Sequence, residues 1–168
     1  MNNILIERQD AMDELKRQGI VGSHVYLIDI IPLIEMIWAD GHVHQIEVAL
    51  LDQFIERHVN KINEMAGHPV LNLDEAQTFA TKLLEQRPDP EWLRNLRLLI
   101  PPLRFTSPDF ESNKTVWRSI VSSCLDIAAS AVKNYPYEID ERINSEEKQC
   151  FFDILDTFGC FMRHGEDQ

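Results

Sequence analysis

The sequence predicts an all-α fold, and three observations carry this prediction. The 168 residues include only 6 glycines, while residue types that favour helices, such as alanine, leucine, isoleucine, glutamate and glutamine, are frequent. Several segments repeat apolar residues at the three-and-four spacing of an amphipathic helix. No segment shows the alternating, β-branched pattern of a strand. We therefore expect about seven helices, and the short connections favour antiparallel packing of neighbours.

Length and composition indicate a single domain over residues 1–168. A chain of this length with 44% hydrophobic residues can bury a core without metals or disulfides. The formal net charge of −12 repels phosphate backbones and anionic lipid, so nucleic-acid binding is disfavoured. Such a surface suits a cation or a basic partner, although the same charge also keeps an ordinary soluble protein dispersed.

The three cysteines, Cys124, Cys150 and Cys160, lie in apolar helical patterns, and the sequence contains no CxxC pair. This pattern is typical of buried, reduced thiols in the cytosol. The first residues lack the basic region and apolar core of a signal peptide. No apolar run reaches the roughly 20 residues that span a bilayer. We therefore expect a cytoplasmic protein that does not insert directly into a membrane.

Residues 5–18 predict a weakly amphipathic first helix that ends at glycines. A second helix is expected over residues 24–39, with Ser23 as its cap. Because this segment is apolar on almost every side, it should lie in the core. Pro32 lies inside it, and two outcomes are open: the helix kinks there, or Pro32 marks the first turn of a second segment.

The third helix is expected from about Gln45 into the sixties, since its apolar stripe keeps helical spacing as far as Gly67-His68-Pro69. Asn72-Leu73-Asp74-Glu75 carries the polar cap and third-position glutamate of a capping box. This signal opens a fourth helix that extends to about Gln86.

A polar cap followed by proline opens each of the next two helices. Asp89-Pro90-Glu91 begins the fifth, which we expect to stop at Pro101-Pro102. Ser107-Pro108-Asp109 begins a long sixth helix, with a break expected near Ser112-Asn113. The last helix begins at Asn144 or Ser145 and carries an apolar stripe from Phe151 to Met162.

Residues 38–47 recur in part as residues 139–147. Three pairs share an offset of one hundred residues: Asp40 and Asp140, Val43 and Ile143, and Glu47 and Glu147. We interpret the repeat as two copies of a helix–loop–helix unit, over about 24–62 and 115–162, with the helices of about 72–104 inserted between them. If the copies are related by a pseudo-twofold axis, their loops could face each other.

Loop architecture alone accounts for much of the repeat. Glu47 and Glu147 occupy the third helical position of capping boxes. Gly41 can take the positive φ that ends a helix. Asp40 and Asp140 can hydrogen-bond to loop amides, so this interpretation requires no ligand.

The second interpretation is a divalent-cation site. Mg²⁺, Mn²⁺ and Ca²⁺ prefer oxygen ligands, and two facing loops would bring four carboxylates together. Two histidines in the first copy add imidazole ligands, so Zn²⁺ also fits. The candidate ligands are Asp40, His42, His44, Glu47, Asp140 and Glu147.

Other constellations are weaker. Asp29 and Glu35 lie on otherwise apolar segments, and a carboxylate among core residues must find a partner. His58 is expected to be an ordinary core or boundary histidine. The sequence has no nucleophile elbow, phosphate-binding loop or dinucleotide fingerprint, so no catalytic residue is predicted. Three basic residues expected to form a solvated face rather than an RNA patch are Arg94, Arg97 and Arg104.

The chain resembles the TerB-like (tellurite-resistance protein B) family over roughly residues 24–62 and 115–162. The resemblance is carried by the apolar helix ending in Ile37-Trp38-Ala39-Asp40-Gly41, then Val43, then Glu47 opening an amphipathic helix. The late copy fits more weakly. The resemblance implies a compact, acidic, all-helical bacterial domain of the cytosol, linked to resistance to tellurite and other chemical stress.

Members of this family are thought to bind metal through the loop acids and to act with membrane-associated partners, and no catalytic activity is established for the domain. Carried over to this chain, the implied ligands are Asp40, Glu47, Asp140 and Glu147. The sequence departs from the family pattern in two ways: Glu141 replaces the glycine after the second aspartate, and the two loop histidines are additions.

We therefore expect a non-enzymatic module that binds a divalent metal and a protein partner. The alternative is an acidic protein-interaction domain without metal. A third possibility is a small hydrolase in which the carboxylates activate water through a metal, and it requires an open pocket beside Asp40.

Overall fold

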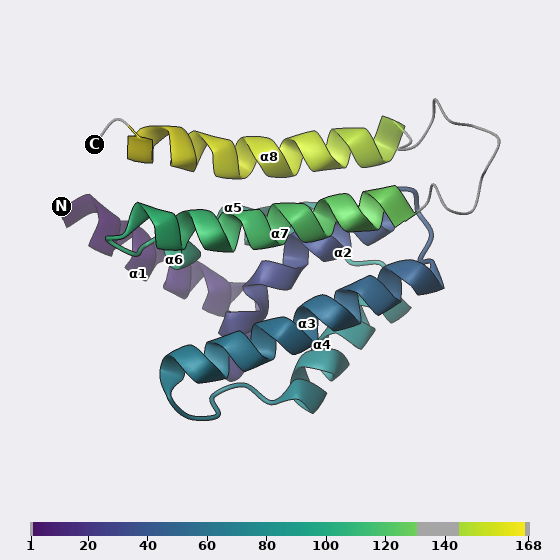
Figure 1. Cartoon of the computed structure of the whole chain (residues 1–168), viewed down its shortest axis with the longest axis horizontal. Helices are drawn as coiled ribbons and strands as arrows, with labels where there is room; N and C mark the ends of the chain where they lie inside the picture. Colours follow the sequence, from purple (N-terminus) through teal and green to yellow (C-terminus); the bar gives the residue numbers. More distant parts are fainter. Residues whose placement is uncertain (1, 131–144, 167–168) are drawn as a thin grey trace.

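The computed structural model describes residues 2–130 and 145–166, and the side chains of residues 8–130 and 146–159. Within these residues all regular secondary structure is helical (Figure 1), which confirms the predicted class. The elements are α1 (Asn2–Arg17), the 3₁₀ helix η1 (Gly22–Ile30), α2 (Ile31–Trp38), α3 (Gln45–Ala66), α4 (Leu73–Glu85), α5 (Pro90–Leu98), α6 (Ile100–Arg104), α7 (Phe110–Ser130) and α8 (Ser145–Glu166).

The apolar segment predicted over residues 24–39 forms the centre of the core. It consists of η1 and α2, and Pro32 lies in the first turn of α2. Proline is tolerated there because the first N–H groups of a helix have no intrahelical acceptor. The second of the two open outcomes, a new segment at Pro32, is therefore correct. Most of the apolar side chains of α2 are fully buried, each contributing about 1.5–3 kcal/mol.

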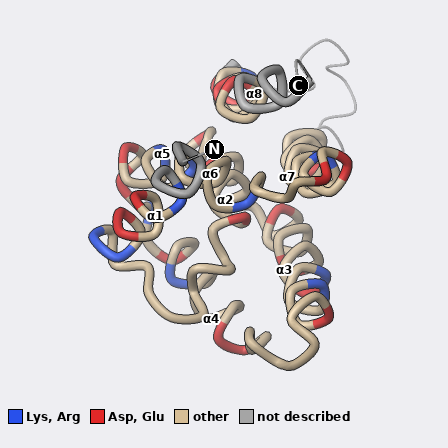
Figure 2. The backbone as a smooth tube through the Cα atoms, turned by 90° about the vertical axis from the view of Figure 1, so that its left-hand side faces the viewer, with Lys and Arg blue, Asp and Glu red and all other residues tan. Residues whose placement is uncertain are grey.

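The remaining helices pack around α2. In the view of Figure 2, α2 lies between α5 on one side and α3 and α7 on the other, and it contacts all three as well as α8. The long helices α7 and α8 lie beside each other in Figure 1, and they are also in contact. This arrangement brings the start of α8 towards the end of α2, where the predicted site begins.

The local start signals mostly act as predicted. The Asn72 side chain accepts hydrogen bonds from Asp74 N (2.8 Å) and Glu75 N (3.2 Å), and Asp89 Oδ1 accepts one from Glu91 N (2.9 Å). The prediction for Ser23 is wrong, because its hydroxyl donates to the Glu75 carboxylate at 3.3 Å and makes no cap hydrogen bond to η1.

The break predicted in the sixth helix is absent from the described residues, since α7 is continuous. Asn113 instead uses its side chain outside the helix: Oδ1 accepts from Ser107 N and Nδ2 donates to Ser107 O, both at 3.0 Å. The fifth helix also ends differently. α5 stops at Leu98, and Pro101 and Pro102 lie in the short helix α6, because prolines are compatible with a first turn.

Both copies of the proposed repeat contain a pair of helices, α2 with α3 and α7 with α8. The connection of the second copy, residues 131–144, lies outside the described residues, and Asp140 lies within it. The pseudo-twofold axis stays a prediction.

Within the described part of the chain, no single helix combines the length and apolar character needed to cross a bilayer. Arg8–Arg17 and Gly22–Trp38 meet those criteria only as a pair, and the pair is bent by 101°. The buried residues of η1 and α2 belong to the core of the domain.

Candidate functional site

The α2–α3 loop (residues 39–44) turns at Gly41, whose φ is +84°. Gly41 N donates a hydrogen bond to Trp38 O at 2.8 Å. Glycine adopts this left-handed conformation without the penalty that a Cβ atom imposes. The predicted role of Gly41 in ending the helix is therefore confirmed, and the turn points the chain into α3.

Asp40 holds this loop together with both of its oxygens. Oδ1 accepts a hydrogen bond from His42 N at 3.0 Å, and Oδ2 lies 3.0 Å from His44 Nε2. The hydrogen bond to Asp40 is the largest of the effects that raise the pKa of His44. His42 is exposed, and its ring lies edge-on to that of His44 with centroids 6.5 Å apart. The prediction that Asp40 bonds to a loop amide is confirmed.

Glu47 closes the loop from the first turn of α3. Its Oε1 accepts a hydrogen bond from His44 N at 2.9 Å, as expected for a capping box. The residue is only 2% exposed. Burial raises the pKa of Glu47 to about 7, and the hydrogen bond from His44 N opposes that rise. Glutamate is rarely buried to this degree, so this burial is the unusual feature of the loop.

Glu147 brings the second copy of the repeat to the same place. It lies in the first turn of α8 and is 2% exposed, like Glu47. Burial is the main effect that raises the pKa of Glu47, and the hydrogen bond to Asp40 is the main one that raises the pKa of His44. The negative charge of Glu147 adds the smallest contribution to each. The structure therefore brings Glu147 of α8 within electrostatic range of the α2–α3 loop, which holds Asp40, His44 and Glu47.

The residue types of this cluster suit a hard or borderline divalent cation. The contacts do not form a ready coordination shell, because Asp40 Oδ2 is bonded to the imidazole of His44 and would have to exchange it for a metal. Among the described residues, no group of three or more His, Cys, Asp or Glu side chains is placed to hold a metal ion. Asp140, the remaining predicted ligand, lies outside those residues.

A buried ion pair lies behind the loop and was not predicted. Glu35 Oε2 accepts a hydrogen bond from Arg97 Nη1 at 2.7 Å, and Arg97 Nε donates to Thr157 Oγ1 at 3.1 Å. Arg97 is 5% exposed, so the prediction that it lies on a solvated face is wrong. The reason is that the carboxylate of Glu35 needs a counter-charge in the core.

Glu35 remains only partly satisfied. Its Oε1 is buried and has no hydrogen-bond partner among the described residues. Burial raises the pKa of Glu35 to about 7, against the lowering effect of Arg97. The pair lines a cavity of about 320 Å³ between α2, α5 and α8, which Trp38, Cys150 and Asp153 also border.

The thiols near this cavity are unreactive. Cys124 is fully buried, Cys150 is partly buried, and both are free. Burial raises the pKa of Cys150 to about 12 and raises that of Cys124 well above its usual value, which disfavours the thiolate that metal binding and nucleophilic chemistry require. The third cysteine, Cys160, has no described side chain.

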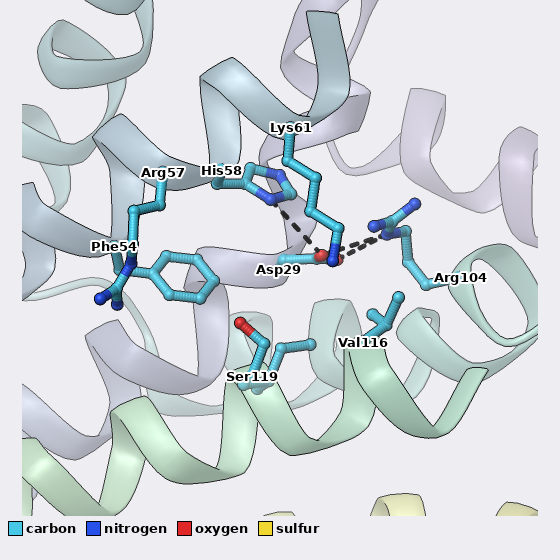
Figure 3. Close-up of a pocket in the computed structure, with 9 residues that line it drawn as sticks. Asp29, Phe54, Arg57, His58, Lys61, Arg104, Val116 and Ser119 are labelled. Atoms are coloured by element: carbon cyan, nitrogen blue, oxygen red, sulfur yellow. Dashed lines mark hydrogen bonds and ion pairs between the residues drawn. The ribbon is translucent and has the colours of Figure 1, made fainter. Parts of the chain in front are cut away.

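A second carboxylate–arginine pair joins Asp29 of η1 to Arg104 of α6. Arg104 Nε donates to both Asp29 oxygens, at 3.0 and 3.1 Å (Figure 3). His58 lies beside them: Nε2 donates to Tyr26 O at 2.6 Å, while Nδ1 is 3.8 Å from Asp29 Oδ2. His58 also stacks on Phe54, with centroids 5.6 Å apart, and is the satisfied core histidine that the sequence predicts.

No protein-family model matches the chain, and searches of curated proteins and of solved structures also return no match.

Proposed function

We propose that this protein is a non-catalytic module that binds a divalent cation where the α2–α3 loop meets the first turn of α8. One observation carries the proposal: Glu47 and Glu147, from different helices, are both 2% exposed and lie close enough for one charge to perturb the other. Two neighbouring buried carboxylates disfavour each other's ionised form. A bound cation would remove that conflict.

The charges around Glu47 also favour a bound cation. No lysine or arginine among the described residues forms an ion pair with it. In the same part of the chain, the groups that stabilise its ionised form are the amide and imidazole of His44. A divalent cation supplies the missing positive charge more fully than one imidazole does.

The proposed ligands are Glu47, Glu147, Asp40 and His44, with His42 and Asp140 as further candidates. Carboxylates alone would favour Mg²⁺, Mn²⁺ or Ca²⁺, whereas recruitment of imidazole would favour Zn²⁺. On the basis of the resemblance to the TerB-like family, we further propose that the protein acts in resistance to chemical stress in the bacterial cytoplasm. Its partner there would be a membrane-associated protein.

The first test is thermal unfolding of untagged, metal-stripped protein with Mg²⁺, Mn²⁺, Ca²⁺ and Zn²⁺ added in turn. A cation that binds only the folded state at 100 times its Kd stabilises it by about 2.7 kcal/mol, which corresponds to a rise in Tm of about 5–10 °C for a chain of this size. We expect such a rise for at least one of these ions.

Variants separate ligand loss from loss of the cap. Glu47→Gln keeps an oxygen that can accept the His44 amide hydrogen bond, so the loop should form while the cation-dependent rise disappears. Glu64→Gln, an exposed substitution on the same helix, should keep the full rise. An unchanged Tm with all four ions, or an equal rise in Glu47→Gln, contradicts the proposal.

The alternative function is an acidic protein-interaction domain without metal, and one observation favours it. The hydrogen bonds of Asp40, His44 and Glu47 already form a complete loop and cap. A pull-down that recovers one stable partner, undiminished by Asp40→Asn with Asp140→Asn, would support this function over cation binding.

A further inference from the structure

A second cavity, of about 240 Å³, lies between α3, α6 and α7 and carries the opposite charge to most of the molecule (Figure 3). Three cationic side chains line it, Arg57, Lys61 and Arg104, against one carboxylate, Asp29. The chain as a whole has 28 acidic and 16 basic residues. The positive charge around this cavity is therefore opposite in sign to the net charge of the chain.

The donors of these cations are largely unused. Asp29 receives hydrogen bonds only from Nε of Arg104 within the described residues. Neither terminal nitrogen of that guanidinium has an acceptor there, and the side chains of Arg57 and Lys61 make no hydrogen bond or ion pair in the same part of the chain. Asp29 therefore fixes Arg104 in position while leaving two of its nitrogens able to donate.

The three cations are not equivalent. In Figure 3 the Lys61 side chain extends in the direction of the Asp29–Arg104 pair, whereas Arg57 extends away from it. We call Lys61 and Arg104 the inner set of donors because both are directed to Asp29, although Lys61 is exposed to solvent. Ser119 on α7 adds a hydroxyl to the lining. Arg57 contributes charge from one turn earlier on α3.

We propose that this cavity binds a small oxyanion of the phosphate class. An oxyanion with several acceptor oxygens can receive charge-assisted hydrogen bonds from an arginine fork and a lysine together. The cavity is smaller than the roughly 300–1,000 Å³ typical of sites for drug-sized molecules. It therefore suits inorganic phosphate or the phosphate end of a larger compound that extends into solvent.

Asp29 does not prevent this binding. Both oxygens of Asp29 accept from Arg104 Nε. Asp29 is 2% exposed, and His58 packs beside it. Three positive groups against one negative group leave an excess of two charges in the lining. The cavity is separate from the α2–α3 loop in its residues, so this inference does not depend on the proposed cation site.

The test is isothermal titration calorimetry of the full chain in metal-free buffer of constant ionic strength. Inorganic phosphate is the first probe, glycerol phosphate reports whether a monoester also fits, and sulfate and acetate test the oxyanion class. We expect saturable binding of phosphate, and a Kd for glycerol phosphate in the same range if the site receives the end of a larger ligand.

Two variants decide the assignment. Lys61→Gln should weaken phosphate binding about tenfold or more, because it removes an unpaired charge from the inner set. Lys82→Gln, an exposed lysine on α4, changes the net charge equally and should leave the Kd unchanged. Because neither lysine is buried, both variants should fold.

Arg104→Lys keeps a positive charge beside Asp29 but removes the arginine fork, and should weaken binding as Lys61→Gln does. Equal Kd values for Lys61→Gln, Lys82→Gln and the unaltered chain would overturn the proposal. So would binding heats that are the same for phosphate and acetate, because they would show only general attraction of anions.

Discussion

At the scale of single residues, the buried carboxylates are the unusual feature of this chain. Asp29 and Glu35 each obtain an arginine, from 75 and 62 residues away respectively. Glu47 obtains a backbone amide and an imidazole instead. The sequence indicated that Asp29 and Glu35 needed partners but not which ones, because an ion pair between distant segments leaves no local pattern.

Glu35 makes stability depend on pH in a defined direction. Its pKa is about 7 in the folded protein and 4.5 in a solvated chain. Between these values the folded state binds more protons than the unfolded state, so the free energy of unfolding falls as pH rises from about 4.5 to 7. One such group accounts for up to about 3 kcal/mol, and Glu47 adds an effect of the same sign.

Glu35→Gln should therefore reduce the fall in the free energy of unfolding with rising pH. It should not abolish that fall, because Glu47 still contributes to it. The amide oxygen that Glu35→Gln introduces can still accept from Arg97 Nη1, so the fold should be retained. Urea unfolding at pH 5 and at pH 8 measures the effect, with Glu64→Gln as the exposed control. A decline as steep in Glu35→Gln as in the control would show that Glu35 is not the group responsible.

At the scale of elements, local chemistry decided most helix starts. The caps at Asn72 and Asp89 and the first-turn position of Pro32 follow from rules about which backbone groups are free at a helix end. The prediction failed at Ser112-Asn113. Polar residues there suggested a break, whereas Asn113 bonds to the preceding loop and leaves α7 intact.

The turn between α3 and α4 is fastened by one side chain that sequence patterns did not identify. Asn63 Oδ1 accepts from Val70 N (2.8 Å) and Leu71 N (2.9 Å), and Nδ2 donates to Leu71 O (2.8 Å). These bonds join residues seven and eight positions apart, outside the reach of helix-capping rules. Their loss would leave three partly buried backbone groups without this partner.

We expect Asn63→Ala to destabilise the protein by about 2 kcal/mol, since unsatisfied buried polar groups cost about 1–3 kcal/mol each and water replaces some of the lost bonds. Asn60→Ala on the exposed side of the same helix should change stability by no more than about 0.5 kcal/mol. Urea denaturation gives both values. Similar effects in the two variants would show that the Asn63 bonds do not hold the turn.

At the scale of the whole molecule, the class and the central helix were predictable because burial on nearly every side leaves an apolar signature in α2. The internal repeat added long-range information that propensities lack. It related Glu47 to Glu147 through the sequence alone, and in the structure both are buried in the first turn of a helix. The cation-lined cavity was not predicted, because Arg57 and Lys61 of α3 and Arg104 of α6 are distant in the sequence and line one cavity only in the folded chain.

Whether the two buried glutamates hold a divalent cation can be decided by equilibrium dialysis. The metal-stripped chain is dialysed against Mg²⁺, Mn²⁺, Ca²⁺ or Zn²⁺, and the bound metal is then measured. We expect about one ion per chain for at least one of these metals, loss of that ion in Glu47→Gln with Glu147→Gln, and retention in Glu64→Gln. No bound ion in the unaltered chain, or equal binding in the double variant, would refute cation binding at this pair.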